Sequence, residues 1–336
     1  MNYIDTEEGR MNVQVRSRLQ VLAVFALCTV ALQVTAPVYG AYPDKPIRMI
    51  VPFPPGGSND VLGRYVGQKL GERLGEQIVI DNRGGANGII GAELAANSPA
   101  DGYTLLMVST SYVMNAAVRK LSYNVEKTFD PIATVASSPN CIVVHPGFVN
   151  TVQELVERAR AQPGKILYGS TGVGGFNHFG GELFNKVAKV KLTMVAYKGG
   201  GPAMIDVMSG QIPMMFSSIT QVLPHVRNGK LKIIAVGAAK RSPVIPDVPT
   251  VIESGFPGYE VVVWWGFETP AGVPAAIQRK LTREINAVVN DPEAKKRLLA
   301  DAAEPLTLTP AQFRKMIHDG VQKWKAVADE AGIHLH

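Results

Sequence analysis

The fold is decided by the stretch Pro52-Phe53-Pro54-Pro55-Gly56-Gly57-Ser58-Asn59-Asp60, which joins a predicted strand to a predicted helix. The β-rich run 47–51 precedes it, and apolar residues at helical spacing follow from 61 to 70. Gly56 and Gly57 allow the backbone to approach a ligand closely, and the exposed amides and dipole of a helix start attract an anion. The alternative interpretation is a simple turn in which Ser58 caps the helix.

Short β-rich runs and helical patterns alternate along the rest of the chain, which predicts mainly parallel sheets flanked by helices. Further strands are expected at 78–80, 104–108, 166–169, 194–197 and 231–236. Helices are expected at 151–161, from about 177, from about 202, and at 274–290, 292–299 and 310–331. Thr151 and Glu154 form a capping box at the first of these helices. A chain of 336 residues has room for two such α/β units.

Two more strand-to-helix loops are rich in glycine and small polar residues, at 169–178 and 197–202. The first offers the hydroxyls of Ser170 and Thr171 and leads into His178, and the second adds Tyr197 and Lys198. In open α/β sheets the ligand lies beyond the carboxyl ends of the strands, so we expect the three loops to converge. The alternatives are a structural histidine and a solvent-exposed lysine on a flexible connector.

The first forty residues have the layout of a secretory signal. Arg16 and Arg18 precede an apolar run at 21–32, and a small residue, Gly40, marks the expected cleavage site before Ala41. The apolar run is shorter than the roughly 20 residues of a membrane-spanning helix, so a cleaved signal and a periplasmic location are expected rather than a retained anchor. The acidic residues before Met11 suggest that translation begins at Met11.

Composition and motifs indicate binding rather than catalysis. The net charge of +6 suits an anionic solute, but the basic residues are scattered, which argues against nucleic acid. Nucleophile-elbow, zinc and Walker motifs are missing, so no metal or cofactor is expected. A periplasmic esterase using Ser170 and His178 is the enzymatic alternative. After removal of Cys28 with the signal, Cys141 remains alone in an apolar run and is expected to be buried.

At these loops the sequence resembles the Bug-type receptors of tripartite tricarboxylate transporters, which are periplasmic solute-binding proteins. The resemblance covers nearly the whole chain after residue 41. It rests on these stretches: 42–48, 52–60, 81–85 with Gly88, 101–105, 170–178, 181–184, 197–199, 210–212 and 270–274.

The resemblance implies a two-lobed α/β Venus-flytrap fold that closes over one small carboxylate solute and delivers it to the transporter's membrane subunits. Lobe 1 would take residues 41–141 and 266–336, and lobe 2 residues 142–265. The chain is expected to act as a monomer and not as an enzyme. The ligand-binding residues carried over are Phe53, Gly56, Gly57, Asp60, Ser170, Thr171, Gly172, His178, Tyr197, Lys198 and Gly199.

Three finer expectations follow. Asp206 matches an acidic position of the family and is expected to be a structural cap. Pro213 stands where the family usually has an acidic residue, which points to a cleft that favours a more apolar or more anionic ligand. Of the neighbours Trp264 and Trp265, one is expected in the core and one in the cleft. A ligand sensor for a membrane signalling partner remains the alternative to a transport receptor.

Overall fold

The computed structural model describes residues 42–331 and 333. The predicted signal segment 1–40, the start at Met11, and the tail residues His334 and His336 lie outside the described residues. No helix in the part of the chain that the structure describes is long and apolar enough to cross a bilayer.

The first half of the sheet has the strand order β2-β1-β3-β9-β4. Strand β1 runs parallel to β2 and β3, and β9 lies antiparallel to both β3 and β4. A short strand, β10, pairs with β4. The bounds of these strands are β1 Ile47–Val51, β2 Ile78–Asn82, β3 Thr104–Ser109, β4 Phe129–Val144, β9 Val262–Pro270 and β10 Glu304–Pro305.

The second half is built on the far end of the same long strand. Here β4 lies antiparallel to β7 on one side and to β8 on the other, and β5 runs parallel to β7 and β6. The bounds of the additional strands are β5 Leu167–Ser170, β6 Thr193–Ala196, β7 Met214–Ser218 and β8 Lys232–Gly237.

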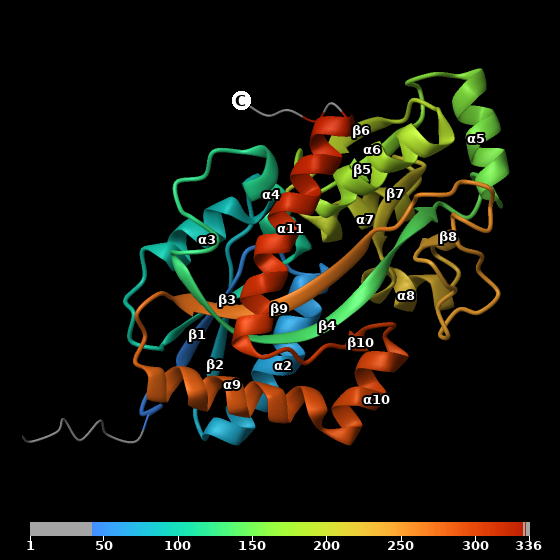
Figure 1. The fold of residues 1–336 in the computed structure, drawn as a ribbon. Coiled ribbons are helices and arrows are strands. Elements are labelled where there is room, and N and C mark those ends of the chain that lie inside the picture. Colours follow the sequence, from blue (N-terminus) through green and yellow to red (C-terminus); the bar gives the residue numbers. More distant parts are fainter. Residues whose placement is uncertain (1–41, 332, 334–336) are drawn as a thin grey trace, which may run out of the picture. The chain divides into compact units, whose positions relative to one another are not determined.

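Strand β4 therefore joins the two halves. Its first part, up to Pro139, pairs with β9, and its last five residues, Asn140–Val144, pair with β7 and β8. Figure 1 shows it as one long curved arrow beside β9, running from the half that holds α9 to the half that holds α5. Register shifts between Pro131 and Ala133 and between Thr134 and Ala136 accompany this course, as is usual where a strand bends.

Helices flank both halves of the sheet (Figure 1). We call β1, β2, β3 and β9 with η1, α2, α3, α4, α9, α10 and α11 the first lobe, and β5 to β8 with α5 to α8 the second lobe. The helix bounds are α2 Ser58–Leu74, η1 Ala86–Gly88, α3 Ile89–Ala96, α4 Thr110–Val118, α5 Val152–Ala161, α6 Phe176–Ala188, α7 Gly200–Met208, α8 Ile219–Arg227, α9 Ala275–Asn290, α10 Pro292–Ala300 and α11 Pro310–Ala331. This two-lobed α/β fold confirms the expected fold class.

Local chemistry explains why α2 packs tightly on its sheet. Its buried face contains Gly63 and Gly67, and a Cβ on them would lie 3.2 Å from Val51 Cγ2 and 3.1 Å from Ile80 Cδ1. The helix ends at Gly75, whose φ of 76° is the left-handed conformation typical of a helix terminus. The loop at 52–57 and the first turn of α2 are thus held at the carboxyl end of β1.

The burial of Cys141, Trp264 and Trp265 can be compared with what the sequence led us to expect. Cys141 is fully buried, and its thiol donates to Ser217 O, as expected for a packing role. Trp265 is fully buried, but Trp264 is also buried, with 8% exposure, and its ring packs edge-on against Phe313. Trp264 lines a groove of about 590 Å³ that it shares with α11, and the expectation that one tryptophan faces the ligand cleft stays a prediction.

Candidate functional site

A small chamber lies between the lobes, with a volume of about 30 Å³. That is room for about two water-sized groups. We define the chamber by the thirteen residues that line it. They are Phe53, Gly57, Ser58, Asn59, Ser109, Ser111, Thr171, Phe176, Asn177, Gly200, Ser218, Gln221 and Val263.

The starts of five helices meet at this chamber. Except for Phe53, Thr171 and Val263, every lining residue is the N-cap or a first-turn residue of α2, α4, α6, α7 or α8. The first amides of a helix lack intrahelical acceptors, and the helix dipole places partial positive charge there. Five such ends around one space create a strong preference for negative charge.

None of the thirteen described residues that line the chamber carries a charged side chain. The nearest acidic group on α2, Asp60, is turned away and accepts hydrogen bonds from Gly56 N (3.0 Å) and Asn82 Nδ2 (2.9 Å). It also pairs with Arg64 at 2.9 Å. Burial acts to raise the pKa of Asp60, but these hydrogen bonds and the Arg64 charge bring it below its usual value. Asp60 thus holds the loop in place as a buried carboxylate.

Two amide side chains among the lining residues, one from each lobe, have a buried polar atom without a partner. Asn59 Oδ1 and Gln221 Nε2 are buried and have no hydrogen-bond partner among the described residues. Ser217 Oγ donates to Gln221 Oε1 at 3.3 Å, which directs the Nε2 donor away from that bond. A buried amide atom without a partner is costly, so a ligand group that reached either atom would remove that cost.

Hydroxyl groups supply further donors. Ser111 Oγ accepts from Phe176 N at 3.1 Å and Ser218 Oγ accepts from Gln221 N at 3.4 Å, so each hydroxyl keeps its own proton to donate. The chamber therefore combines neutral donors with helix dipoles, and it can bind a carboxylate without an ion pair.

The structure brings only some of the predicted site residues into the chamber, namely Phe53, Gly57 and Thr171. Gly56 donates its amide to Asp60 and shapes the loop. Gly199 is the N-cap of α7 and packs on Pro54 of the first lobe. Gly56 and Gly199 therefore lie next to lining residues but do not line the chamber themselves.

Gly172, Tyr197 and Lys198 lie instead on a side groove at the surface, about 310 Å³ in volume. We define this side groove by its lining residues: Ala86, Asn87, Arg119, Thr171, Gly172, Val173, Ala196, Tyr197 and Lys198. The Tyr197 hydroxyl donates to Asp206 Oδ2 at 2.7 Å, and burial with this contact raises the pKa of Tyr197 to about 12. Asp206 is therefore structural, but as an anchor for Tyr197 within α7 rather than as a helix cap.

Ser170 and His178 are both buried and serve the loop between β5 and α6. The Ser170 hydroxyl donates to Gly172 O at 3.2 Å, and His178 Nδ1 accepts from Gly174 N at 3.2 Å. Burial, opposed by Glu182, lowers the pKa of His178, which keeps the ring neutral near pH 7. These bonds do not direct Ser170 and His178 toward each other as a nucleophile and base would be.

Pro213 lies far from the chamber. It precedes β7, and the chamber residue Ser218 is at the opposite end of that strand. Five strand residues separate the two positions by about 16 Å. The specificity effect expected of Pro213 is therefore not supported by its position.

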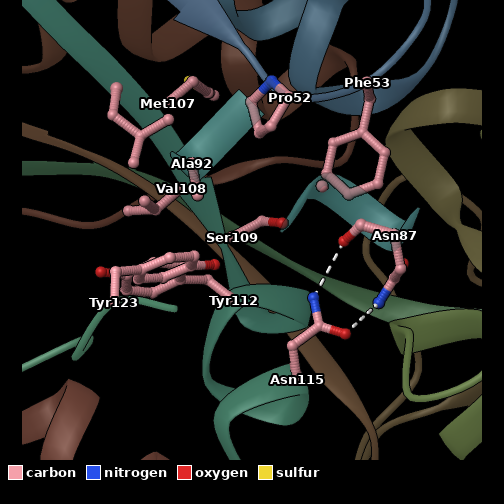
Figure 2. A pocket seen from close by; sticks show the side chains of 12 residues that line it. Pro52, Phe53, Asn87, Ala92, Met107, Val108, Ser109, Tyr112, Asn115 and Tyr123 are labelled. Atoms are coloured by element: carbon pink, nitrogen blue, oxygen red, sulfur yellow. Dashed lines mark hydrogen bonds between the residues drawn. The ribbon is translucent and has the colours of Figure 1, made fainter. Parts of the chain in front are cut away.

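A second cavity, of about 10 Å³, lies behind Phe53 in the first lobe. Figure 2 shows Phe53 at the upper right, Ser109 near the centre, and the rings of Tyr112 and Tyr123 at the lower left. Asn87 and Asn115 pair with each other at its edge (Figure 2). No group of three or more His, Cys, Asp or Glu side chains that could hold a metal occurs among residues 42–331 and 333.

This geometry defines a class of protein, namely a two-lobed binding protein with a small chamber between its lobes. The sequence model of the tripartite tricarboxylate transporter family receptor matches residues 62–333. The chain therefore belongs to this receptor family and is a solute-binding receptor, not an enzyme.

Several relatives are similar over nearly their whole length. Protein BugT of Bordetella pertussis is 34% identical over 321 residues, which covers 94% of this chain and 98% of BugT. The structure of the periplasmic binding protein BugD is 32% identical, with a TM-score of 0.84 over 87% of this chain and 99% of that chain. An R. palustris protein solved with adipate is 31% identical, with a TM-score of 0.85 and coverage of 87% and 99%. MatC from Rhodopseudomonas palustris with bound malate is 28% identical, with a TM-score of 0.81 and coverage of 85% and 99%.

Proposed function

We propose that this receptor captures a small carboxylate in the interlobe chamber and delivers it to the membrane subunits of a tripartite tricarboxylate transporter. The observation that carries the proposal is the meeting of five helix starts around one space without a charged side chain. Solved relatives with adipate and malate support a carboxylate ligand. We further propose that the protein works as a monomer in the periplasm after cleavage near Gly40.

The lobes are proposed to be residues 41–141 with 266–336, and residues 142–265. The change of partners along β4 near Asn140 supports the first limit, and the second limit falls within β9, between Trp265 and Gly266. The two lobes would move apart to admit the ligand and close to exclude water. A micromolar dissociation constant would correspond to roughly −8 kcal/mol.

The proposal is tested by thermal-shift screening of mono-, di- and tricarboxylates, followed by calorimetric titration of those that raise the melting temperature. We expect at least one carboxylate to bind saturably, while its amide or methyl ester does not. If no carboxylate stabilises the protein, the proposal fails for those ligands. Turnover of an ester panel that disappears in Ser170→Ala would contradict the receptor role.

A further inference from the structure

Asn87 connects the lobes from a position outside the chamber. Its Nδ2 donates to Asn115 Oδ1 at 3.0 Å, and Asn115 Nδ2 donates back to Asn87 O at 2.9 Å (Figure 2). This reciprocal pair fixes the Asn87 amide, whose Oδ1 accepts from Thr171 Oγ1 of the second lobe at 2.7 Å. All three side chains are buried, with 8% exposure or less.

The backbone around Asn87 is held in a sparsely populated conformation. Asn87 has φ 55° and ψ 36°, and the preceding Ala86 has φ 46°. Two consecutive non-glycine residues at positive φ are costly, although asparagine tolerates this region better than most. Such strain persists where surrounding contacts over-determine it and is concentrated at functional sites. Here the strained turn points the Asn87 amide toward the second lobe.

The second lobe leaves space for Asn87 to reach Thr171. A Cβ on Gly175 would lie 2.4 Å from Asn87 Oδ1 and 2.5 Å from Thr171 Oγ1. Gly175 has φ −92°, so alanine would fit its backbone and only this contact requires glycine. Asn87 thus reaches Thr171 across the lobe boundary at a point where Gly175 leaves room for it.

Thr171 links this contact to the ligand, because it also lines the chamber. Thr171 Oγ1 has one proton to donate and two acceptors within reach. Asn87 Oδ1 is 2.7 Å from Oγ1, and Asn177 Oδ1 is 3.3 Å from it. The shorter bond crosses between the lobes, so the position of Thr171 in the chamber wall depends on Asn87.

We propose that Asn87, supported by Asn115, is the latch that holds the closed receptor shut through Thr171. The inference rests on the proposed carboxylate-receptor function. Asn87 is a positioning residue in this scheme. It slows opening, and hence ligand release, without contacting the ligand itself.

The test is Asn87→Gly, with Lys189→Gly as the matched control. Glycine accepts the left-handed backbone and removes the latch amide, and Lys189 is an exposed residue with a similar φ of 51° at the end of α6. Both changes relieve the same backbone strain, but only one removes a bond between the lobes. The ligand is the carboxylate that raises the wild-type melting temperature most.

We expect Asn87→Gly to raise the ligand dissociation rate about tenfold, with the association rate within about twofold of wild type, as the loss of one buried hydrogen bond implies. The radius of gyration from small-angle scattering with ligand should increase. Lys189→Gly should match wild type throughout. Gly175→Ala, which keeps every latch side chain, should reproduce the faster dissociation.

Carboxylate binding by wild type tests the proposed function, whereas the dissociation rate and radius of gyration of the two variants test the latch. If wild type binds a carboxylate but Asn87→Gly and Gly175→Ala leave both dissociation rate and radius of gyration unchanged, the latch is wrong and the receptor function stands. If wild type binds no carboxylate, the proposed function fails. The latch is then tested by small-angle scattering alone. An unchanged radius of gyration in both variants then overturns the latch, and an increase in both supports it.

Discussion

Gly199 of the second lobe packs directly on Pro54 of the first, and a Cβ at Gly199 would lie 2.5 Å from Pro54 Cδ. Because Gly199 has φ 178°, alanine fits its backbone, and the collision with the proline ring is the only obstacle. We expect Gly199→Ala to prevent full closure and to weaken carboxylate binding at least tenfold, while the melting temperature of the ligand-free protein changes little. Calorimetric titration measures the affinity. Gly147→Ala, in an exposed loop of the same lobe, is the control.

Removing the Asp60 carboxylate should loosen the loop at 52–57. Asp60→Ala leaves Gly56 N without its acceptor and leaves Asn82 Nδ2 with Phe53 O alone, so we expect the free energy of unfolding to fall by about 2 kcal/mol. Asp60→Asn keeps one acceptor oxygen and should lose less. Urea unfolding at pH 7 measures both. Equal stability of Asp60→Ala and wild type would show that the loop does not depend on this carboxylate.

The Asp60 carboxylate should also make the free energy of unfolding fall in acid. Because the pKa of folded Asp60 is lowered, its contribution is fully present above the unfolded pKa of about 4 and is lost as the pH falls through the folded pKa. Between pH 5 and pH 3 wild type should therefore lose more stability than Asp60→Ala. Parallel slopes over this range would rule out the effect.

One substitution in the chamber and one in the side groove should affect carboxylate affinity differently. Gln221→Leu removes the amide of a residue that lines the chamber and should weaken carboxylate binding about tenfold. Lys198→Met removes a cation from the side groove and should change affinity less than threefold. The two variants titrated with the same carboxylate decide between the sites. A larger loss in Lys198→Met would place the ligand in the side groove.

Because Glu268 is buried, we expect the free energy of unfolding to fall as the pH rises toward 8. It is fully buried on β9, and burial raises its pKa to about 8, although Tyr112 and the Arg314 charge act to lower it and Asp130 adds to the rise. Between the ordinary carboxyl pKa and 8 the unfolded state has released a proton that the folded state keeps. Stability then falls with rising pH by roughly 1.4 kcal/mol per unit.

Substitution by glutamine removes this titration. Glu268→Gln should lose less stability than wild type between pH 5.5 and pH 8, and urea unfolding across that range measures the difference. Glu284→Gln is a useful comparison, since its ion pairs with Arg73 and Arg283 lower the pKa of Glu284 and confine its titration to acid. If Glu268→Gln and wild type show the same pH dependence, Glu268 is ionised in the folded protein.

Sequence patterns predicted the regular strands and helices well, but they missed the elements that join the lobes. The strands expected at 47–51 and 104–108 and the N-cap at Thr151 are confirmed, with Thr151 Oγ1 accepting from Glu154 N at 3.1 Å, while the Glu154 side chain accepts from Asn150 N and not from Thr151 N. Strand β4 was not predicted, because it contains Pro131 and Pro139 and changes partners along its length. A strand with two environments has no single alternation of polar and apolar residues.

The serines and glutamine of the chamber were missed for a related reason. Strand β3 ends at Ser109 and α4 begins at Thr110, and β7 ends at Ser218 and α8 begins at Ile219. No glycine-rich loop separates strand from helix at either junction, so the signal that marked the other three loops is missing. Their position at the carboxyl edge of the sheet was the available clue, since a serine that directly follows a strand can also cap a helix.

Binding by helix starts alone has a consequence for release. A ligand held by lysine or arginine in contact with solvent loses affinity steeply as ionic strength rises, because mobile ions screen full charges. The dipoles around this chamber are enclosed and carry only partial charges, so the affinity should vary little between dilute and saline surroundings. Opening then returns the solute to water without breaking an ion pair, which suits a protein that has to give up its cargo as readily as it collects it.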